Sequence, residues 1–392
     1  MAVLTKKMDI LIVGGTGVLS SVVCKEAMER KMNVTLVNRG NRMNMIPQGA
    51  FLIKSNKDDY ENIKGCIGEK KYDAVIDFLC FNEEDIIKSF GFYKDYTKQY
   101  FFISSCAVYD TRKGGIMRED SEKVLPLWKY SVNKWKCEQL LAKLAYDSST
   151  KFTVIRPAVT YGNTRIPYGV APEYGYHWTI IERAKHSKPI IRWNKGNNIC
   201  NMTRVEDFAI GVVGLVGNEK AYNEAFNVCG DETPSFNNVI DSISKYLKIE
   251  IPTIDIDSEF YAKELSDPGE LLLGRAVDSV NSNEKLRRAV PEFKQNIPLE
   301  EGVSMTLQSY IDNHYERGIS WSFDAECDRV ISLWCKKNKL DRNQYNIGFI
   351  DYFGSATMLD KYQYWMTFHK HSPFAKILSL LYKVFFKLKS LI

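Results

Sequence analysis

The chain has 392 residues, of which 45% are apolar and 26% charged, and these values fit a globular protein with a sizeable core. The formal net charge of +5 is mild, and no basic stripe interleaved with aromatic residues occurs in the main body, so nucleic acid is not an expected partner. The nine cysteines are odd in number, scattered, and without a C-x-x-C pair. Such usage predicts reduced thiols in a cytoplasmic protein, with neither a disulfide framework nor a metal site.

The stretch 9–20 opens the first strand–turn–helix unit. Residues 9–13 form the apolar run of a buried strand, a turn with Gly14 and Gly17 follows, and residues 18–28 have the apolar pattern of a helix. Glycines let the backbone approach a pyrophosphate, and the free N–H groups of a helix N-terminus bind that anion. Ser20 stands where glycine or alanine is usual, and it is small enough to be tolerated. The unit predicts dinucleotide binding, with the glycine turn of an ordinary βαβ unit as the alternative.

Strand and helix patterns alternate as far as residue 156. Short β-branched or aromatic runs occupy residues 33–37, 50–54, 72–78, 100–104 and 152–156, and a helical pattern occupies 135–146. Repeated βα units predict an α/β fold with a Rossmann-type, doubly wound parallel sheet. We expect an NAD(P)-binding domain over 1–160, a smaller α/β substrate-binding region interleaved with the sheet over 161–320, and a helical C-terminal extension over 321–392.

The second predicted strand ends in Asn38-Arg39, about where a cofactor ribose binds in such folds. An acidic residue there would bind the ribose hydroxyls of NAD, but this position has none. Asn38 can hydrogen-bond a ribose and Arg39 can pair with a 2′-phosphate, so the pair favours NADP over NAD. The alternative is that Arg39 is a solvated loop charge.

A second informative pattern combines Ser104 and Ser105 with Tyr130 and Lys134. The two serines end a predicted strand, and open α/β sheets bind ligands outside the carboxyl ends of their strands. Tyr130 and Lys134 are four residues apart, so they share one face of a helix. A lysine ammonium beside a tyrosine lowers the pKa of the phenol towards neutrality, and such a phenol exchanges a proton with a substrate hydroxyl. The pattern therefore predicts an acid/base site.

Together these motifs resemble those of the extended short-chain dehydrogenase/reductases, the NAD(P)-dependent epimerase/dehydratase group. The resemblance covers roughly residues 8–310 and rests on motifs in that family's order and spacing: Gly14-Gly-Thr-Gly17, Ser104-Ser-Cys-Ala-Val-Tyr109, Tyr130-x-x-x-Lys134, Arg156-Pro-Ala-Val-Thr-Tyr-Gly162, Val205-Glu-Asp-Phe-Ala209 and Phe226-Asn-Val-Cys-Gly230. It implies that Tyr130 is the acid/base and Ser105 the catalytic serine. It also implies that Lys134 orients the nicotinamide ribose and tunes Tyr130.

The resemblance further implies cofactor contacts at the ends of the strands. Asn56 and Asp59 fall where the family contacts the adenine, and Pro157 and Val159 would flank the nicotinamide. The implied cofactor site comprises Gly14, Thr16, Gly17, Val18, Asn38, Arg39, Asn56, Asp59, Phe78, Leu79, Ser104, Tyr130, Lys134, Pro157 and Val159.

Departures from the family pattern bear on the substrate. The Asp-Glu pair that follows the catalytic residue in family dehydratases is Cys106-Ala107 here, so a 4,6-dehydratase is not expected. Two arginines that grip a nucleotide diphosphate are missing, with Cys200 and Asp267 near their positions. Either other cations replace them, or the substrate lacks a diphosphate, or those cations are only surface charges. The predicted substrate-binding residues are Cys80, Tyr161, Arg192 and Arg204, with Lys195 as a further cation.

Two segments lie outside these motifs. Residues 166–178 are rich in Gly, Pro and aromatics and predict a loop over a sugar-sized ligand, with Tyr168, His177 and Trp178 as candidate contacts. An ordinary connection at a domain interface is the alternative. In the extension, residues 323–337 predict a helix. Residues 373–392 predict a basic amphipathic helix that either lies on an anionic membrane surface or packs on the body or on a second subunit.

These patterns predict an enzyme that transfers a hydride between NAD(P) and a sugar or nucleotide-sugar, with a tyrosine as acid/base. Returning the hydride to the other face gives an epimerase, and stopping after one transfer gives a dehydrogenase or ketoreductase. We expect a cytoplasmic homodimer, peripheral at the membrane if the last helix binds there. The alternative is a catalytically quiet family member that serves as a cofactor sensor or an RNA-binding protein.

Overall fold

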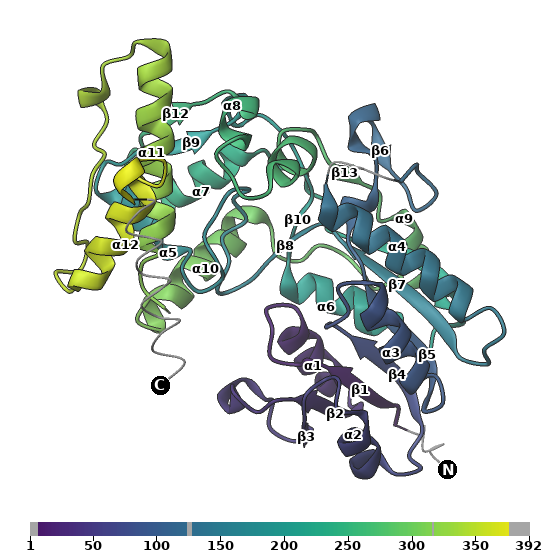
Figure 1. Cartoon of the computed structure of the whole chain (residues 1–392). Helices are drawn as coiled ribbons and strands as arrows, with labels where there is room; N and C mark the ends of the chain where they lie inside the picture. The colour runs from purple at the N-terminus through teal and green to yellow at the C-terminus, as the bar shows by residue number, and fades with distance from the viewer. Residues whose placement is uncertain (1–6, 124–127, 316, 376–392) are drawn as a thin grey trace.

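The computed structural model describes residues 7–123, 128–315 and 317–375. Its centre is a parallel sheet of seven strands in the order β11-β7-β5-β4-β1-β2-β3 (Figure 1). The strands are β1 (Asp9–Val13), β2 (Asn33–Asn38), β3 (Phe51–Lys54), β4 (Tyr72–Asp77), β5 (Thr97–Ile103), β7 (Lys151–Pro157) and β11 (Glu224–Val228). The predicted fold class is confirmed, and the predicted strands fall within a few residues of these bounds.

Helices cover both faces of this sheet. The sheet helices are α1 (Ser20–Glu29), α2 (Tyr60–Ile67), α3 (Glu83–Tyr93), α4 (Lys129–Leu144), α6 (Val205–Gly214) and α9 (Glu284–Ala289). One apolar core joins the sheet to α1, α6 and α9, and a second joins its other face to α2, α3 and α4. The central strands are buried on both faces, which explains their continuous apolar runs.

The strand order places the ligand-binding crevice. The chain moves outward from β1 to β3 and then returns to β4 on the other side of β1. The carboxyl ends of β1 and β4 flank this reversal, where open α/β sheets bind ligands. The glycine turn follows β1 directly, so it lies at this reversal.

Two predicted elements begin later in the sequence than the observed ones. β5 begins at Thr97 rather than at residue 100, and α4 begins at Lys129 rather than at residue 135. The first turn of α4 faces the cleft described below, so its residues follow the demands of a site and lack a core-facing apolar stripe.

The substrate-side region contains short parallel pairs, namely β8 (Val159–Tyr161) with β10 (Met202–Arg204), β9 (Ile190–Arg192) with β12 (Thr253–Asp255), and β6 (Ile116–Met117) with β13 (Val280–Asn281). Its helices are α5 (Trp178–Lys185), α7 (Phe236–Leu247), α8 (Ser258–Ala262) and α10 (Leu299–Asp312), with a π-helical turn at Glu270–Arg275. Because β11, α6 and α9 return to the main sheet, this region is interleaved with it. The domain boundaries given above stay predictions.

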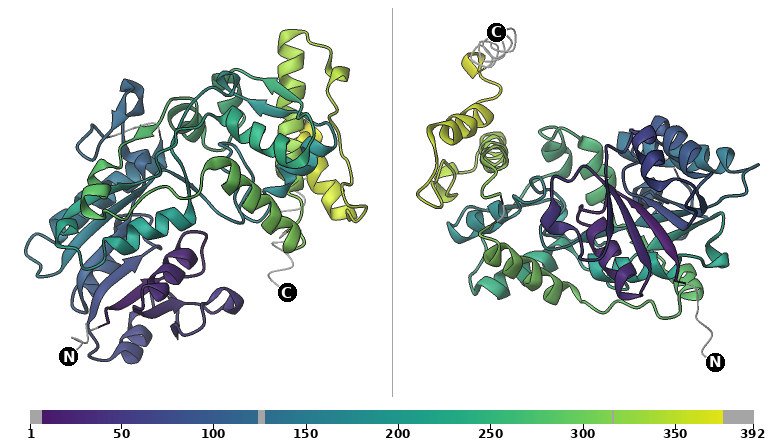
Figure 2. Two further views of the ribbon diagram at one scale, coloured as in Figure 1. Left: turned by 180° about the vertical axis from the view of Figure 1, so that it is seen from behind. Right: turned by 90° about the horizontal axis from the view of Figure 1, so that it is seen from below.

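The C-terminal extension forms a helical layer at the end of the molecule away from β1, in both views of Figure 2. It contains α11 (Trp321–Asn338) and α12 (Met358–Phe368), so the helix predicted over 323–337 is present. The basic helix predicted over 373–392 lies almost wholly outside the described residues. Within the described part of the chain, no helix combines the length and apolarity needed to cross a bilayer.

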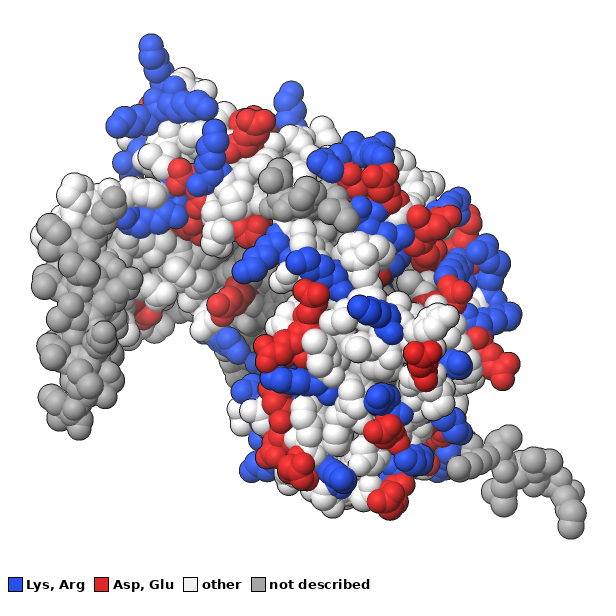
Figure 3. Space-filling model, turned by 45° about the vertical axis from the view of Figure 1, so that its right-hand side comes forward, with Lys and Arg blue, Asp and Glu red and all other residues white. Residues whose placement is uncertain are grey.

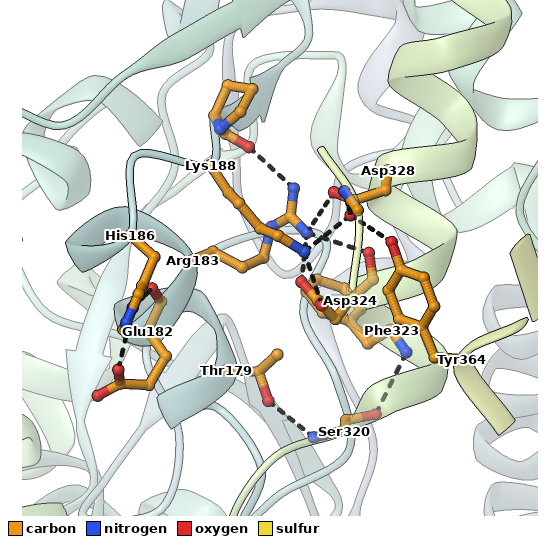
Figure 4. Close-up of polar contacts among 12 residues, drawn as sticks. Thr179, Glu182, Arg183, His186, Lys188, Ser320, Phe323, Asp324, Asp328 and Tyr364 are labelled. Atoms are coloured by element: carbon orange, nitrogen blue, oxygen red, sulfur yellow. Dashed lines mark hydrogen bonds and ion pairs between the residues drawn. The ribbon is translucent and has the colours of Figure 1, made fainter. Parts of the chain in front are cut away.

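A buried cluster of four charges joins the extension to α5 (Figure 4). The Arg183 guanidinium lies 2.5 Å from Asp324 and 2.8 Å from Asp328, and Lys188 Nζ lies 2.9 and 2.7 Å from the same two carboxylates. Tyr352 and Tyr364 each donate a hydroxyl hydrogen bond to one of these carboxylates. Two cations therefore balance two acids in a site closed to solvent.

Candidate active site

The glycine turn after β1 has a backbone that only glycine adopts readily. Gly14 and Gly15 have φ angles of 114° and 75°, and a Cβ added to Gly15 would lie 2.9 Å from a methyl carbon of Leu36. The following helix α1 has no acidic residue in its first turn, so nothing in that turn neutralises its positive end. This cradle fits a pyrophosphate and would not fit bulkier side chains.

Polar side chains hold the turn in place. Asn38 donates from its amide nitrogen to the Gly14 carbonyl oxygen and to Thr16 Oγ1, and it accepts from the Gly40 N–H. Ser20 Oγ accepts from the Gly17 N–H at 2.9 Å. Asn38 therefore reaches the predicted ribose end, but its amide braces the turn. Ser20, predicted only to be tolerated, orients a backbone donor of the cradle.

Ser105, Tyr130 and Lys134 meet in one cleft. Ser105 follows β5, and its hydroxyl is close enough to the Tyr130 phenol to lower the pKa of that phenol. Tyr130 lies in the first turn of α4, and Lys134 lies one turn later with its ammonium group buried. Lys134 Nζ donates to the carbonyl oxygens of Cys80 at 2.9 Å and Ile103 at 2.8 Å. The ends of β4 and β5 thus fix the position of the lysine.

The pKa of Tyr130 reflects opposing influences. Tyr130 is 42% exposed as a residue, but its phenol lies inside the cleft, where desolvation raises the pKa of Tyr130 above its usual value and Ser105 opposes this rise. Burial lowers the pKa of Lys134 itself, one turn further along the same helix. Ser105 and two arginines, Arg165 and Arg275, lower the pKa of Tyr130 against this rise, and the Lys134 ammonium is held nearby by two backbone carbonyls.

A buried ion pair supports the floor of this site. Glu138, two turns beyond Tyr130 on α4, pairs with Arg156 of β7 and accepts a hydrogen bond from Ser104. Arg156 also donates to Tyr109 Oη at 2.7 Å, and Tyr109 donates to Asn227 at 2.6 Å. This network ties β5, β7, β11 and α4 together beneath the cleft, so the Ser104 hydroxyl is committed to Glu138.

The cleft has a volume of about 1130 Å³ and runs from the glycine turn past Tyr130 to the π-helical turn. Its charged lining differs between the two ends. The cofactor end is lined by Arg39, Arg42, Lys57 and Lys134, and the far end by Arg165, Asp267, Glu270 and Arg275. On the face shown in Figure 3, by contrast, cations and acids are intermingled without a broad field of one sign. A cationic end beside the glycine turn suits an anionic dinucleotide.

A family comparison agrees with this geometry. Residues 10–229 match the model of the NAD dependent epimerase/dehydratase family. The chain belongs to this family. The match spans the sheet from β1 to β11 and includes the glycine turn, Ser105, Tyr130 and Lys134.

Two curated proteins are similar to this family member. One is the chloroplast stem-loop binding protein of 41 kDa b from Arabidopsis thaliana, 25% identical over 60% of this chain, and the matched part spans 62% of the relative's length. The other is 2′-dehydrokanamycin reductase from Streptomyces kanamyceticus, 18% identical over 73% of this chain and 80% of that protein.

Solved structures of epimerases share the fold. An epimerase from Methanothermobacter thermautotrophicus superposes with a TM-score of 0.64 at 16% identity, over 79% of this chain and 94% of that one. UDP-glucose 4-epimerase from Thermotoga maritima gives 0.63 at 18% identity, over 78% and 100%. UDP-glucuronic acid 4-epimerase from Bacillus cereus, in complex with NAD, gives 0.62 at 17% identity, over 79% and 100%.

The structure brings the predicted cofactor residues of this family member to the cleft, with one exception. Asp59 does not line it, because its carboxylate accepts the Asn62 N–H and caps α2. The predicted residues that do line the cleft are Gly14, Thr16, Gly17, Val18, Asn38, Arg39, Asn56, Phe78, Leu79, Ser104, Tyr130, Lys134, Pro157 and Val159.

The four predicted substrate-binding residues do not line the cleft. The Cys80 thiol is buried and donates to Asp77, and the Tyr161 ring is buried against Gly302 of α10. Arg192 pairs with Asp255 across the β9–β12 pair.

Arg204 is likewise committed elsewhere. Its guanidinium is fully buried and bonds Glu206 and Thr306. Lys195, the further candidate cation, is also absent from the cleft lining. The first four were predicted from the sequence alone, and tertiary packing directs their side chains into other contacts.

The aromatic loop contributes different residues from those predicted. Tyr168, His177 and Trp178 are buried in the core behind the cleft, whereas Tyr174 and Arg165 line it. The loop therefore reaches the cleft at Tyr174, and Arg165, which precedes the loop directly, also lines the cleft.

Several lining or supporting residues were not predicted. Glu138 could have been found, since Tyr130, Lys134 and Glu138 repeat every four residues on one helix face. Trp128 and Arg275 had no local signal, because they reach the cleft only through the packing of distant segments.

Proposed function

We propose that the chain is an NAD(P)-dependent epimerase or oxidoreductase that moves a hydride to or from a carbinol carbon of a sugar, with Tyr130 as the acid/base. The observation that carries this proposal is that Ser105, Tyr130 and Lys134 line one cleft that continues to the glycine turn. The UDP-sugar epimerases among the structural neighbours support a sugar substrate, and the relative 2′-dehydrokanamycin reductase supports an oxidoreductase.

In this proposal each residue has a separate task. A bound nicotinamide supplies the hydride acceptor or donor. Tyr130 removes the proton from the substrate hydroxyl, or returns it, at its phenol oxygen. Ser105 hydrogen-bonds the phenol and stabilises its ionised form. Lys134, fixed by the carbonyls of Cys80 and Ile103, places a cation beside the bound cofactor and the tyrosine.

The replacement Tyr130→Phe tests the assignment. We expect turnover to fall by roughly 10²–10⁴-fold because the proton-transfer group is lost, whereas cofactor affinity is retained because the glycine cradle is untouched. Cofactor titration by fluorescence and steady-state kinetics measure the two effects. Near-normal turnover of the variant would remove Tyr130 from this role.

Cofactor preference is a further part of the proposal. Arg39 and Arg42 are exposed on the cleft lining at the ribose end, and no acidic residue lines that end in the described chain. Guanidinium groups suit a 2′-phosphate, so we propose NADP as the preferred cofactor within this NAD-dependent family.

A second function is favoured by one observation, the similarity to a protein named for stem-loop binding. In this alternative the fold binds RNA and the cofactor site is regulatory. A salt-dependent RNA mobility-shift assay run beside the cofactor titration discriminates the two. RNA binding without turnover would support the alternative.

We also propose that the protein is a homodimer and that residues 373–392 mediate contact with a membrane surface or with the protein itself. Light scattering of the full chain and of a variant lacking 373–392 tests the first part. Sedimentation of both with anionic liposomes tests the second, and unchanged sedimentation of the truncated chain excludes membrane binding by this segment.

A further inference from the structure

The far end of the cleft has an electrostatic character of its own. Its charged lining residues are two arginines and two acids, Arg165, Arg275, Asp267 and Glu270, whereas the cofactor end is lined by cations alone. The formal charge of this end is therefore zero. A ligand with two negative charges would bring them close to two carboxylates, whereas a single negative charge can pair with the arginines.

Arg165 has donors to spare. One guanidinium nitrogen donates to the Thr160 carbonyl oxygen at 2.8 Å, and the guanidinium lies 5.2 Å from the centre of the Tyr174 ring. None of the ion pairs within the described residues involves Arg165. The aromatic ring orients the cation without neutralising it.

Arg275 also has an unused donor. It ends the π-helical turn, its side chain is 13% exposed, and one terminal nitrogen lies 3.2 Å from Glu270. Its other terminal nitrogen makes no hydrogen bond within the described chain, and the residue lines the cleft. A guanidinium on the cleft lining with a terminal nitrogen that is not hydrogen-bonded can pair with a bound anion.

The positive charges of both arginines lower the pKa of two cleft side chains, the Tyr130 phenol and the Cys200 thiol, whereas burial raises it. Both arginines line the same cleft as Tyr130, the residue at which the substrate reacts in the proposed function. Trp128 packs against Gly274 beside them, where a Cβ would lie 2.6 Å from the indole, so an apolar wall borders the cations.

Resting on the proposed function, we propose that the substrate carries a single carboxylate, as a uronic acid does, which binds to Arg165 and Arg275 beside the carbon that reacts at Tyr130. A carboxylate matches the planar fork of a guanidinium and accepts two hydrogen bonds from it. The net charge of this end disfavours a nucleotide diphosphate in the same place.

The test compares three probes on cofactor-saturated protein: D-glucuronate, D-glucose and UDP-glucose. Dissociation constants are measured by ligand-detected NMR for the wild type, R165Q, R275Q and the control R192Q, whose arginine pairs with Asp255 away from the cleft. We expect glucuronate to bind more tightly than glucose and to lose about tenfold or more of its affinity in R165Q and in R275Q. R192Q should bind as the wild type does.

The same measurement on Y130F separates this inference from the proposed function. Glucuronate binding that survives in Y130F but fails in R165Q supports the carboxylate subsite even if the acid/base assignment is wrong. Glucuronate that binds no better than glucose, or equal losses in R165Q and R192Q, would overturn it. A loss confined to UDP-glucose would also overturn it, because the anion would then be a diphosphate.

Discussion

At the scale of single residues, the chemistry of the cleft depends on opposing influences on one phenol. Burial raises the pKa of Tyr130, while the Ser105 hydrogen bond and the two arginines lower it. The phenol must be ionised before it can accept the proton of a substrate hydroxyl that is oxidised, so each group that lowers its pKa extends activity to lower pH.

The replacement Ser105→Ala tests this balance. Removing the hydrogen bond leaves burial less opposed, so the pKa of Tyr130 rises and the pH–rate profile for alcohol oxidation moves to higher pH. We expect about a tenfold loss of rate at neutral pH, since one hydrogen bond to a charged group contributes roughly 1.5–3 kcal/mol. Ser105→Thr keeps the hydroxyl and should retain the profile. A profile of S105A that coincides with the wild type would contradict the role of Ser105.

Arg39 gives a second prediction at this scale. The side chain is exposed on the cleft lining, so Arg39→Ala should leave the fold intact. We expect the affinity for NADP to fall roughly tenfold or more, because a charge-assisted pair with the 2′-phosphate is lost. The affinity for NAD, which lacks that phosphate, serves as the control in the same titration. Equal losses for both cofactors would mean that Arg39 does not read the 2′ position.

The acid/base residues could be predicted from sequence because their chemistry is local. Tyr130 and Lys134 share a helix face by spacing alone, and Ser105 follows a strand whose end can be located. The substrate-side residues could not be found in this way. Arg165 and Arg275 are 110 residues apart, and Arg204 and Arg192 looked equally suitable until packing showed them paired elsewhere.

At the scale of elements, the buried charge cluster between α5 and α11 fixes the position of the C-terminal extension. The periodicity of residues 323–337 was sufficient to predict α11, but nothing in it indicates the partner helix. The four charges of Arg183, Lys188, Asp324 and Asp328 are closed to solvent, and burial of Asp328 is outweighed by the two cations, which lower its pKa. Such a cluster is stable only when all four members are present.

The replacement Asp324→Asn tests the contribution of this charge cluster to stability. It leaves two cations against one acid in a buried site, so we expect the free energy of unfolding to fall by about 3–5 kcal/mol. Denaturant titration followed by circular dichroism measures it. Lys245→Gln, which breaks the solvent-exposed pair with Glu300, is the control and should cost less than about 1 kcal/mol. Similar losses in the two variants would show that the buried cluster contributes no more than a surface pair.

At the scale of the whole molecule, the sheet was predictable because each βα unit has its own apolar strand run followed by a helical pattern in the sequence. The apolar runs of β1 and β4 and the glycine turn between strand and helix suffice to place the crevice. The far wall of the cleft was not predictable, since it is assembled from residue 128, the segment around 165–174 and the π-helical turn. Contacts between such distant segments leave no periodic signal in the sequence.

The same loop that supplies Arg165 and Tyr174 makes the stability of the whole chain depend on pH through His177. This side chain is 1% exposed, and its Nδ1 accepts the Ile166 N–H at 3.0 Å. Burial, with a smaller effect from the charge of Arg165, lowers the pKa of His177 to about 3. The unfolded chain, where a histidine has a pKa of about 6.5, therefore binds more protons than the folded chain between these two values.

Folding stability should accordingly fall as the pH decreases below about 6.5, by roughly 1.4 kcal/mol per pH unit from this one group, or about 2 kcal/mol between pH 7 and pH 5. His177→Asn keeps an acceptor for the Ile166 N–H but cannot titrate in this range. The variant is expected to be less stable than the wild type at pH 7, because it loses ring packing, and the gap should narrow by about 2 kcal/mol at pH 5. Denaturant titrations of both proteins at the two pH values measure this narrowing. A gap that is the same at pH 7 and pH 5 would show that His177 does not couple folding to protonation, because the losses from carboxylates elsewhere in the chain are common to both proteins and cancel in the difference.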